Sequence, residues 1–141
     1  MPKDRSGAGY SGTPLVKKLG IREGYRVSFV NEPSGFRTLL GPLPDETELC
    51  GPRSRALNFL HYFVDREADL RARLPKLRSR IRPDGMIWVS WPKKSSGIAT
   101  DVTEDVIRKH AFANTLVDVK VCAVDEIWSG LKLVIRKKDR T

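Results

Sequence analysis

Residues 56–64 form a nearly unbroken apolar run, ALNFLHYFV. Charged residues lie on both sides of this run, and it is rich in aromatic side chains. A strand that is covered on both faces has this composition, because neither of its faces meets water. We therefore expect residues 56–64 to form the central strand of a sheet between two layers.

An amphipathic segment follows the apolar run over residues 65–82. Its aliphatic side chains recur at steps of four, three and four: Leu70, Leu74, Leu77 and Ile81. Acidic residues at its start and basic residues at its end complement the dipole of a helix. The spacing predicts one helix over 65–82, with a kink near Leu74 because Pro75 removes a backbone donor.

The second half of the chain continues this alternation of strands and helices. The tripeptide at 83–85, Pro-Asp-Gly, predicts a turn into a strand at 86–91. Residues 101–104, Asp-Val-Thr-Glu, have the form of a capping box that opens a helix over 102–110. The alternating segments 117–124 and 131–135 predict a hairpin with its turn at 128–130.

The first half contains one short helix and one strand. Thr13 is a predicted cap and Gly20 a predicted stop for a helix over 13–20, and residues 25–30 alternate as a strand does. Residues 36–40 fit a helical turn or a short strand equally well, and the pattern of the stretch that follows, to Arg55, is ambiguous. The order of elements predicts an α/β fold: a shortened Rossmann-like sheet of parallel strands with helical crossovers and a C-terminal antiparallel hairpin.

Length and pattern predict one domain. The chain has 141 residues, which we divide into a flexible arm at 1–12, a domain at 13–137 and a basic tail at 138–141. The string at 7–12, GAGYSG, matches GxGxxG, but no strand precedes it, so we interpret it as part of a flexible or docking arm.

Composition restricts the class of protein and its compartment. No apolar run approaches the ~20 residues of a membrane span, and Cys50 and Cys122 have no metal-binding spacing. His61 and His110 also lack a partner at ligand spacing, so we expect no metal site. These features predict a reduced, cytoplasmic protein, and its net charge of +9 favours anionic partners.

Three blocks carry a family resemblance: GYSGTPLVKKLGI at 9–21, WVSWPKKSSGIATDVTEDVIR at 88–108 and VDVKVCAVDEIWSGLKLVIRK at 117–137. They resemble an uncharacterised bacterial family catalogued as domain-of-unknown-function family 3052. The order of elements from residue 56 onward resembles the second half of a Rossmann-like methyltransferase. The resemblance implies the fold, and because the family has no established activity it assigns no catalytic residue.

Two departures from the methyltransferase pattern predict that adenosylmethionine is not bound in the usual mode. The glycine-rich loop after the first strand is replaced by Asn31-Glu32-Pro33-Ser34-Gly35, which has one glycine and a proline. Residues 41–55 are too few for the strand, helix and strand of the missing cofactor half.

A candidate ligand site lies at the predicted carboxyl ends of the strands. The loop at 93–97 combines two cations, two hydroxyls and a glycine between a strand and a helix, which suits an anion or phosphate, although a solvated loop reads the same way. The residues of the proposed site are Asn31, Glu32, Ser34, Gly35, Trp91, Lys93, Lys94, Ser95, Ser96 and Gly97.

No catalytic residue is predicted, since the sequence contains neither GxSxG nor a Cys/His arrangement. The carboxylates near strand ends, Glu32, Asp65, Asp125 and Glu126, fit an acid–base pair or simple capping roles. Trp88, Trp91 and Trp128 fit core packing or, for the last two, the rim of a pocket.

Three functions stay open. The first is a non-catalytic binding or regulatory protein that takes a small anion or nucleotide. The second is an enzyme with a methyltransferase-like or nucleotide cofactor in a non-standard pocket, for which Glu32 and Asp101 should converge. The third is a nucleic-acid-binding protein that uses Arg78, Arg80 and Arg82 and the basic tail. The strand that ends at Arg136 is a candidate free edge, which leaves a homodimer open.

Overall fold

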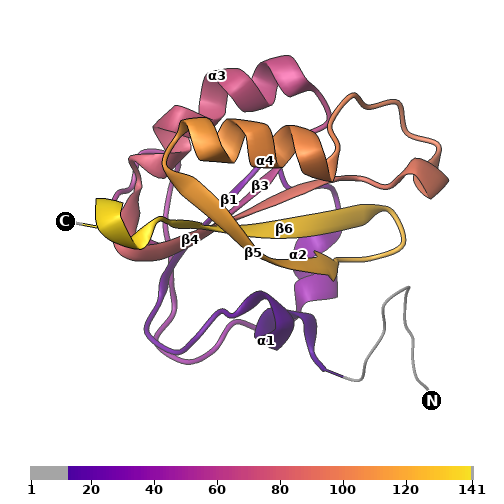
Figure 1. Cartoon of the computed structure of the whole chain (residues 1–141). Coiled ribbons are helices and arrows are strands. Elements are labelled where there is room, and N and C mark those ends of the chain that lie inside the picture. The colour runs from indigo at the N-terminus through magenta and orange to yellow at the C-terminus, as the bar shows by residue number, and fades with distance from the viewer. Residues whose placement is uncertain (1–12, 141) are drawn as a thin grey trace.

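The computed structural model describes residues 13–140, so the GxGxxG string and the predicted arm lie outside the described residues. The described part contains a mixed sheet flanked by helices (Figure 1). The sheet has six strands in the order β2-β1-β3-β4-β6-β5. The strands are β1 (Arg26–Val30), β2 (Glu48–Leu49), β3 (Leu57–Phe63), β4 (Ile81–Pro92), β5 (Leu116–Ala123) and β6 (Trp128–Ile135). The first four are mutually parallel, whereas β6 is antiparallel to both β4 and β5. The predicted α/β Rossmann-like class is confirmed.

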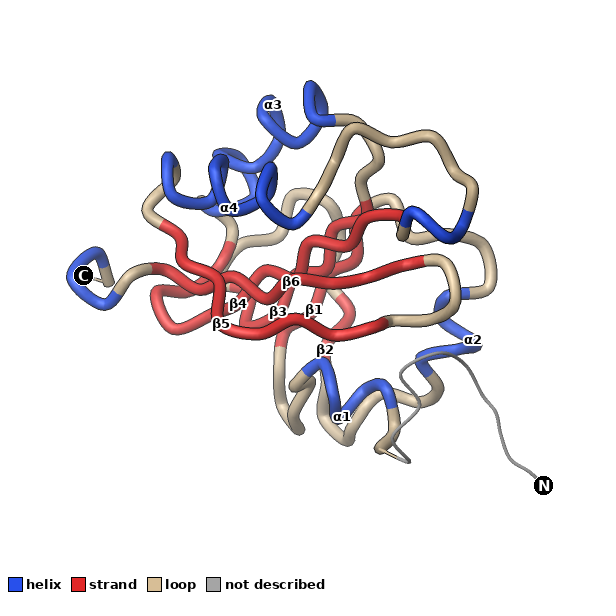
Figure 2. Tube along the Cα trace, turned by 45° about the vertical axis from the view of Figure 1, so that its right-hand side comes forward, coloured by secondary structure: helices blue, strands red, loops and turns tan. Residues whose placement is uncertain are grey.

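Helices lie on both faces of this sheet. Helices α3 (Glu67–Arg78) and α4 (Glu104–Ala113) cover one face, and the short helices α1 (Leu15–Leu19) and α2 (Phe36–Leu40) lie against the other (Figure 2). The predicted helix at 13–20 is confirmed, and Gly20 ends it with φ of 87°. Its first position differs from the prediction, because Pro14 is the capping residue and no side chain caps this helix.

The apolar run at 56–64 forms the middle of the sheet, as predicted. Leu60 and Tyr62 in β3 are buried in the core under α3 and α4, whereas Phe59 and Phe63 are buried in the core on the α1 and α2 side. Alternate side chains of a strand point to opposite faces, so a strand between two layers needs apolar residues at every position.

Helix α3 ends earlier than the period of its leucines predicted. It is continuous through Pro75 and ends at Arg78, and Ile81, the last residue of the predicted helical stripe, begins β4. The guanidinium of Arg80 donates from Nε to the carbonyl of Ser54 (2.9 Å) and from Nη2 to that of Gly51 (2.9 Å). These bonds hold the chain where the helix passes into the strand.

The tripeptide at 83–85 lies inside β4 instead of in a separate turn before it. Leu57 pairs with Ile81 and Phe59 with Met86, so β4 carries extra residues between these two pairs. A Cβ atom on Gly85 would lie 2.7 Å from the carbonyl oxygen of Leu57. Glycine is therefore required at the point where this irregularity approaches the backbone of β3.

The C-terminal hairpin is confirmed, but its turn lies at 124–127 and not at 128–130. Asp125 Oδ1 accepts hydrogen bonds from the backbone amides of Ile127 (2.8 Å) and Trp128 (2.7 Å), which closes the turn before β6 begins. The predicted free edge at Arg136 is wrong, because β6 lies between β4 and β5 and the edge strand is β5.

Helix α4 is also confirmed with a different cap. Thr103 accepts a hydrogen bond from the amide of Val106 (3.2 Å) and caps the helix in place of Asp101. Asp101 instead accepts a bond from the amide of Glu67 (2.7 Å) and so satisfies the first turn of α3. Among residues 13–140, no helix is both long and apolar enough to cross a membrane.

Candidate functional site

The strand order creates a topological switch point between β1 and β3. From β1 the chain passes through α2 to β2 on one side, and it then returns to β3 on the other side of β1. The two strands are in register up to Val30 and Tyr62, so their carboxyl ends are adjacent. Ligands of open α/β sheets bind outside the carboxyl ends of strands at such a point. We call this end of the sheet the carboxyl edge.

The loop after β1 forms one side of the switch point. Asn31 and Gly35 adopt left-handed backbone conformations with φ of 59° and 84°, and both are exposed together with Ser34. Glu32 Oε2 forms an ion pair with Arg37 Nε (2.5 Å), and the guanidinium of Arg37 lies 4.4 Å from the ring centre of Phe29. The predicted site residues in this loop therefore lie together at the carboxyl edge.

Aromatic side chains pack beneath this loop on the face that bears α1 and α2. Phe63, at the end of β3, contacts Phe36 edge-on at 4.9 Å and Trp128 at 5.2 Å between ring centres. Trp128 is half-buried, and its place at the rim of a pocket stays a prediction. The packed aromatic rings therefore form an apolar layer directly below the loop at the carboxyl edge.

His61 and Ser90 form a buried polar pair inside this aromatic cluster. His61 Nε2 lies 2.7 Å from Ser90 Oγ, and its ring stacks on Phe63 at 4.1 Å. Burial lowers the pKa of His61 to about 3, so the ring is neutral in the folded protein. Its Nδ1 atom is buried with no hydrogen-bond partner among the described residues. The sequence predicts a structural role for His61, but no local pattern identifies Ser90 as its partner, because Ser90 lies on another strand.

The loop after β3 forms the other side of the switch point and is tied to the loop before α4. The carbonyl of Asp65 accepts a hydrogen bond from Thr100 Oγ1 (2.7 Å). Glu67 Oε2 accepts bonds from His110 Nε2 and Lys109 Nζ, both at 2.9 Å. The hydrogen bond from His110 lowers the pKa of Glu67 most, and the bond from Lys109 lowers it further. This side of the edge is thus held in place by α4.

The predicted anion loop is closed largely by its own hydrogen bonds. Residues 94–96 form a short 3₁₀ turn in which Ser96 Oγ donates to the carbonyl of Lys93 (2.6 Å) and accepts from the amide of Ile98 (3.1 Å). Lys94, Ser95 and Gly97 are exposed, whereas Trp91 and Lys93 are half-buried. Within residues 13–140, no hydrogen bond or ion pair joins this loop to the loop at 31–35.

Glu32 and Asp101, which were expected to converge if the protein is an enzyme with a non-standard cofactor pocket, have separate partners. Glu32 pairs with Arg37, and Asp101 accepts from the amide of Glu67. Asp125 closes the hairpin turn. Among the described residues, no group of three or more His, Cys, Asp and Glu side chains could hold a metal ion. Both cysteines are free thiols.

The three arginines predicted for nucleic acid do not share one helical face. Arg78 lies at the end of α3 and donates from Nε to Thr115 Oγ1 (2.7 Å). Arg80 is 8% exposed, and Arg82 lies on β4 in an ion pair with Asp84 (3.1 Å). The helix ends before Arg80, so the interpretation of one basic helix over these residues is wrong.

No protein-family model and no curated protein matches the sequence. The fold is similar to solved methyltransferases. A SAM-dependent methyltransferase from Aquifex aeolicus matches with a TM-score of 0.63 at 13% identity, over 86% of this chain and 88% of that one. Magnesium protoporphyrin IX methyltransferase from Synechocystis PCC 6803, with bound SAM, matches with a TM-score of 0.59 at 12% identity, over 86% and 74%. Fibrillarin from Aeropyrum pernix, with natively bound S-adenosyl-L-methionine, matches with a TM-score of 0.56 at 13% identity, over 85% and 73%. The chain thus has a methyltransferase-like Rossmann fold.

Proposed function

We propose that this protein is methyltransferase-like in function as well as in fold, and that it binds S-adenosylmethionine or S-adenosylhomocysteine at the carboxyl edge. The observation that carries the proposal is the switch point between β1 and β3, where the exposed loop at 31–35 follows the end of β1. Similar folds hold S-adenosylmethionine in the Synechocystis and Aeropyrum structures.

The residues at this edge fit such a ligand. The carboxylate of Glu32 is an acceptor for the hydroxyls and the ammonium group of an adenosyl amino acid, and Arg37 already orients it. Gly35 has no Cβ atom and open space around it, so a ligand can approach the backbone closely there. The half-buried ring of Trp128 supplies an apolar surface beside the same edge.

The binding mode would be non-standard. In the usual Rossmann arrangement an acidic residue after the second strand holds the ribose, but here β2 has two residues and is followed by Cys50 and Gly51. The guanidinium of Arg80 donates hydrogen bonds to the carbonyls of Gly51 and Ser54, so these two groups already have a partner within the protein. We therefore propose that the loop after β1, and not the end of β2, binds the ligand.

The fold comparison supports this reading over the non-catalytic regulatory protein that was expected first from the sequence. A small anionic or nucleotide ligand, the cytoplasmic location and the division at residues 12 and 137 stay predictions. The last boundary falls within a short 3₁₀ turn, Lys137–Asp139. Membership of the uncharacterised bacterial family also stays a prediction.

Isothermal titration of the protein with S-adenosylmethionine and S-adenosylhomocysteine tests the proposal. We expect saturable binding that weakens about tenfold in Glu32→Gln, since a charge-assisted hydrogen bond is lost. It should be abolished in Ser34→Tyr, which places a bulky ring at the exposed edge. Glu23→Gln is the matched control, because Glu23 is an exposed carboxylate that precedes β1 at the opposite end of the strand.

Two results would overturn the proposal. One is the absence of binding at millimolar ligand by wild-type protein whose circular dichroism shows a folded α/β domain. The other is binding that Ser34→Tyr and Glu32→Gln leave unchanged, because the ligand would then lie elsewhere.

A further inference from the structure

Positive charge is concentrated at the end of the sheet opposite the carboxyl edge. Three segments meet there: residues 53–55 before β3, residues 78–84 at the junction of α3 and β4, and residues 136–140 after β6. Together they contain nine Arg and Lys residues and two carboxylates, a formal excess of seven, whereas the whole chain has a net charge of +9. We call this surface the amino-edge basic surface.

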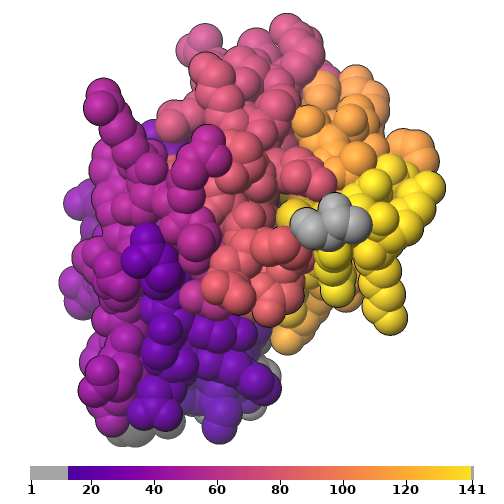
Figure 3. Space-filling model, turned by 90° about the vertical axis from the view of Figure 1, so that its left-hand side faces the viewer, coloured from indigo at the N-terminus to yellow at the C-terminus, as the bar shows by residue number. Residues whose placement is uncertain are grey.

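Hydrogen bonds show that the three segments adjoin one another. Arg55 Nη1 donates to the carbonyl of Ser79 (3.1 Å), which joins the first segment to the second. Arg78 Nε donates to Thr115 Oγ1 (2.7 Å), and the carbonyl of Thr115 accepts from the amide of Arg136 (3.0 Å), which joins the second to the third. Figure 3 faces this surface, and its colours run from magenta through salmon to yellow across one continuous face.

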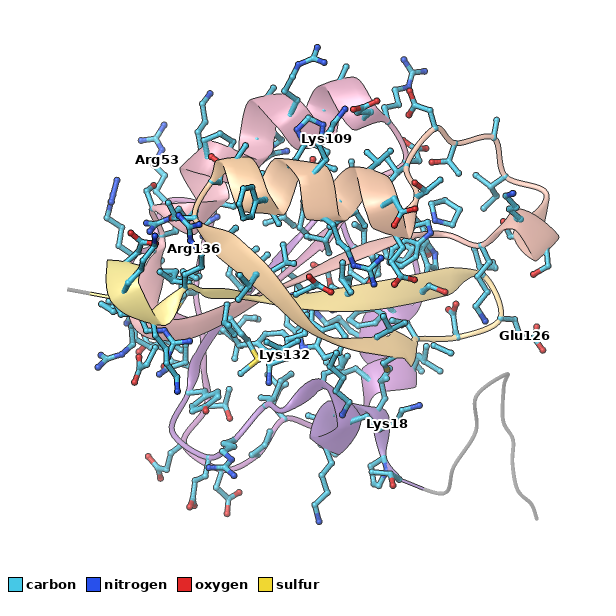
Figure 4. The ribbon with its side chains drawn as sticks, viewed as in Figure 1. Lys18, Arg53, Lys109, Glu126, Lys132 and Arg136 are labelled. Atoms are coloured by element: carbon cyan, nitrogen blue, oxygen red, sulfur yellow. The ribbon has the colours of Figure 1, made fainter. Side chains whose placement is uncertain are left out.

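The two carboxylates on the surface are already neutralised. Asp84 pairs with Arg82 (3.1 Å) and Asp139 with Arg136 (3.0 Å). Arg53, Lys137 and Lys138 are exposed and point to solvent. Figure 4 shows Arg53 and Arg136 on the same side of the molecule, with Glu126 at the far side. The charge is therefore directional. The exposed carboxylates at this end of the sheet, Glu23, Asp45, Glu46 and Glu48, lie on the side of β1 and β2, and Glu48 pairs with Arg26 (2.9 Å).

An exposed aromatic ring borders the same surface. Phe112, near the end of α4, is 68% exposed, more than any other large apolar side chain that the structure describes. The guanidinium of Arg136 lies 5.3 Å from its ring centre. An exposed ring beside basic side chains is the pairing by which proteins hold single-stranded nucleic acid, because the cations contact phosphates while bases stack on the ring. An anionic membrane or an acidic protein would use the charge without requiring a stacking ring.

We infer that the amino-edge basic surface binds single-stranded nucleic acid, with Arg53, Lys137 and Lys138 contacting phosphates and Phe112 stacking on a base. This site lies at the opposite end of the sheet from the proposed adenosyl site, so the two inferences stand or fall separately. It replaces the basic helix predicted from the sequence by a surface that three separate segments assemble.

Fluorescence anisotropy with a labelled 12-nucleotide oligouridylate, measured over a series of salt concentrations, tests the inference. The triple variant Arg53→Gln/Lys137→Gln/Lys138→Gln should bind at least about tenfold more weakly and reduce the slope of log affinity against log salt by about two. Phe112→Ser should weaken binding about tenfold with an unchanged salt slope, because stacking releases no counterions.

The control is Lys17→Gln/Arg66→Gln/Arg71→Gln, which removes the same charge from exposed positions outside the surface. Affinity in this control should stay within about twofold of wild type. The inference is overturned by the absence of saturable binding at low salt, or by equal weakening in both triple variants. It is also overturned if Phe112→Ser binds as wild type does, or if anionic lipid vesicles bind as tightly as the oligonucleotide.

Discussion

His61 Nε2 lies 2.7 Å from Ser90 Oγ in the interior of the sheet, beside the strand ends that form the carboxyl edge. The pair joins two adjacent parallel strands, β3 and β4, on the face covered by α1 and α2. Four phenylalanine rings surround the imidazole, at 4.1–6.3 Å between ring centres. A neutral imidazole in such surroundings ties stability to pH.

The pH dependence has a definite sign. Burial lowers the pKa of His61 from 6.5 to about 3 in the folded protein, so between these values the unfolded chain binds a proton that the folded protein does not. Stability should therefore rise with pH across this window, by up to about 1.4 kcal/mol per unit from this group. Urea unfolding of wild type and His61→Leu between pH 4 and 7 measures it, and the variant should show a shallower slope. Parallel slopes would contradict a buried neutral imidazole.

Arg80 should be structural, because its guanidinium is almost fully buried and serves three acceptors. Besides the carbonyls of Ser54 and Gly51, it donates to Ser28 Oγ (3.2 Å). Arg80→Met should lower the free energy of unfolding by about 2–4 kcal/mol, since buried acceptors lose a charged donor. Chemical denaturation checks this, with Arg82→Met as the control. Arg82 has an exposed partner, and its loss should cost about 0.5 kcal/mol or less.

Gly85 should not tolerate a side chain. A Cβ atom there would lie 2.7 Å from the backbone oxygen of Leu57, which cannot move without disturbing β3. Gly85→Ala should therefore lower the free energy of unfolding by about 2 kcal/mol or more. Gly51→Ala is the matched control, because nothing lies within 4 Å of its added atom. Equal thermal midpoints for the two variants would show that β4 does not approach β3 as described.

Asp101 should stabilise α3 across a large separation in sequence. Its carboxylate accepts the amide of Glu67 (2.7 Å) in the first turn of that helix. Asp101→Ala should reduce the free energy of unfolding by about 1 kcal/mol and increase hydrogen exchange at the start of α3. Thr103→Ala should instead increase exchange at the start of α4. If hydrogen exchange instead increases at the start of α4 in the Asp101 variant, Asp101 caps α4, as the sequence predicted, and this prediction is wrong.

The sequence predicted what depends on local pattern. Local patterns predicted the strand at 56–64, the strand at 117–124 and the helix α3. For β5 the alternation predicted the strand but not its burial, because Val119 and Val121 are 53% and 49% exposed on this edge strand. Ile81 continued the helical spacing but belongs to β4, because its neighbour Arg80 is bound by the carbonyls of Ser54 and Gly51, 26 and 29 residues earlier. The spacing of apolar residues along a helix cannot reveal contacts with residues so far away in the sequence.

The candidate site was predicted less completely, since its parts come from separate strands. The loop at 31–35 was found because loops after strands carry ligands in this class of fold. Ser90, the partner of His61, lies 29 residues away from it. The basic surface likewise exists only where three distant segments meet, and the sequence assigned its charges to a helix and a tail.

An NMR titration of the labelled protein with S-adenosylhomocysteine would show both whether the ligand binds and whether it lies at the carboxyl edge. We expect saturable shifts of the backbone amides at residues 31–37 and 64–67, with the amides at 53–55 and 136–140 unshifted. Unchanged spectra at millimolar ligand, or shifts confined to the amino-edge basic surface, would contradict a ligand site at the ends of β1 and β3.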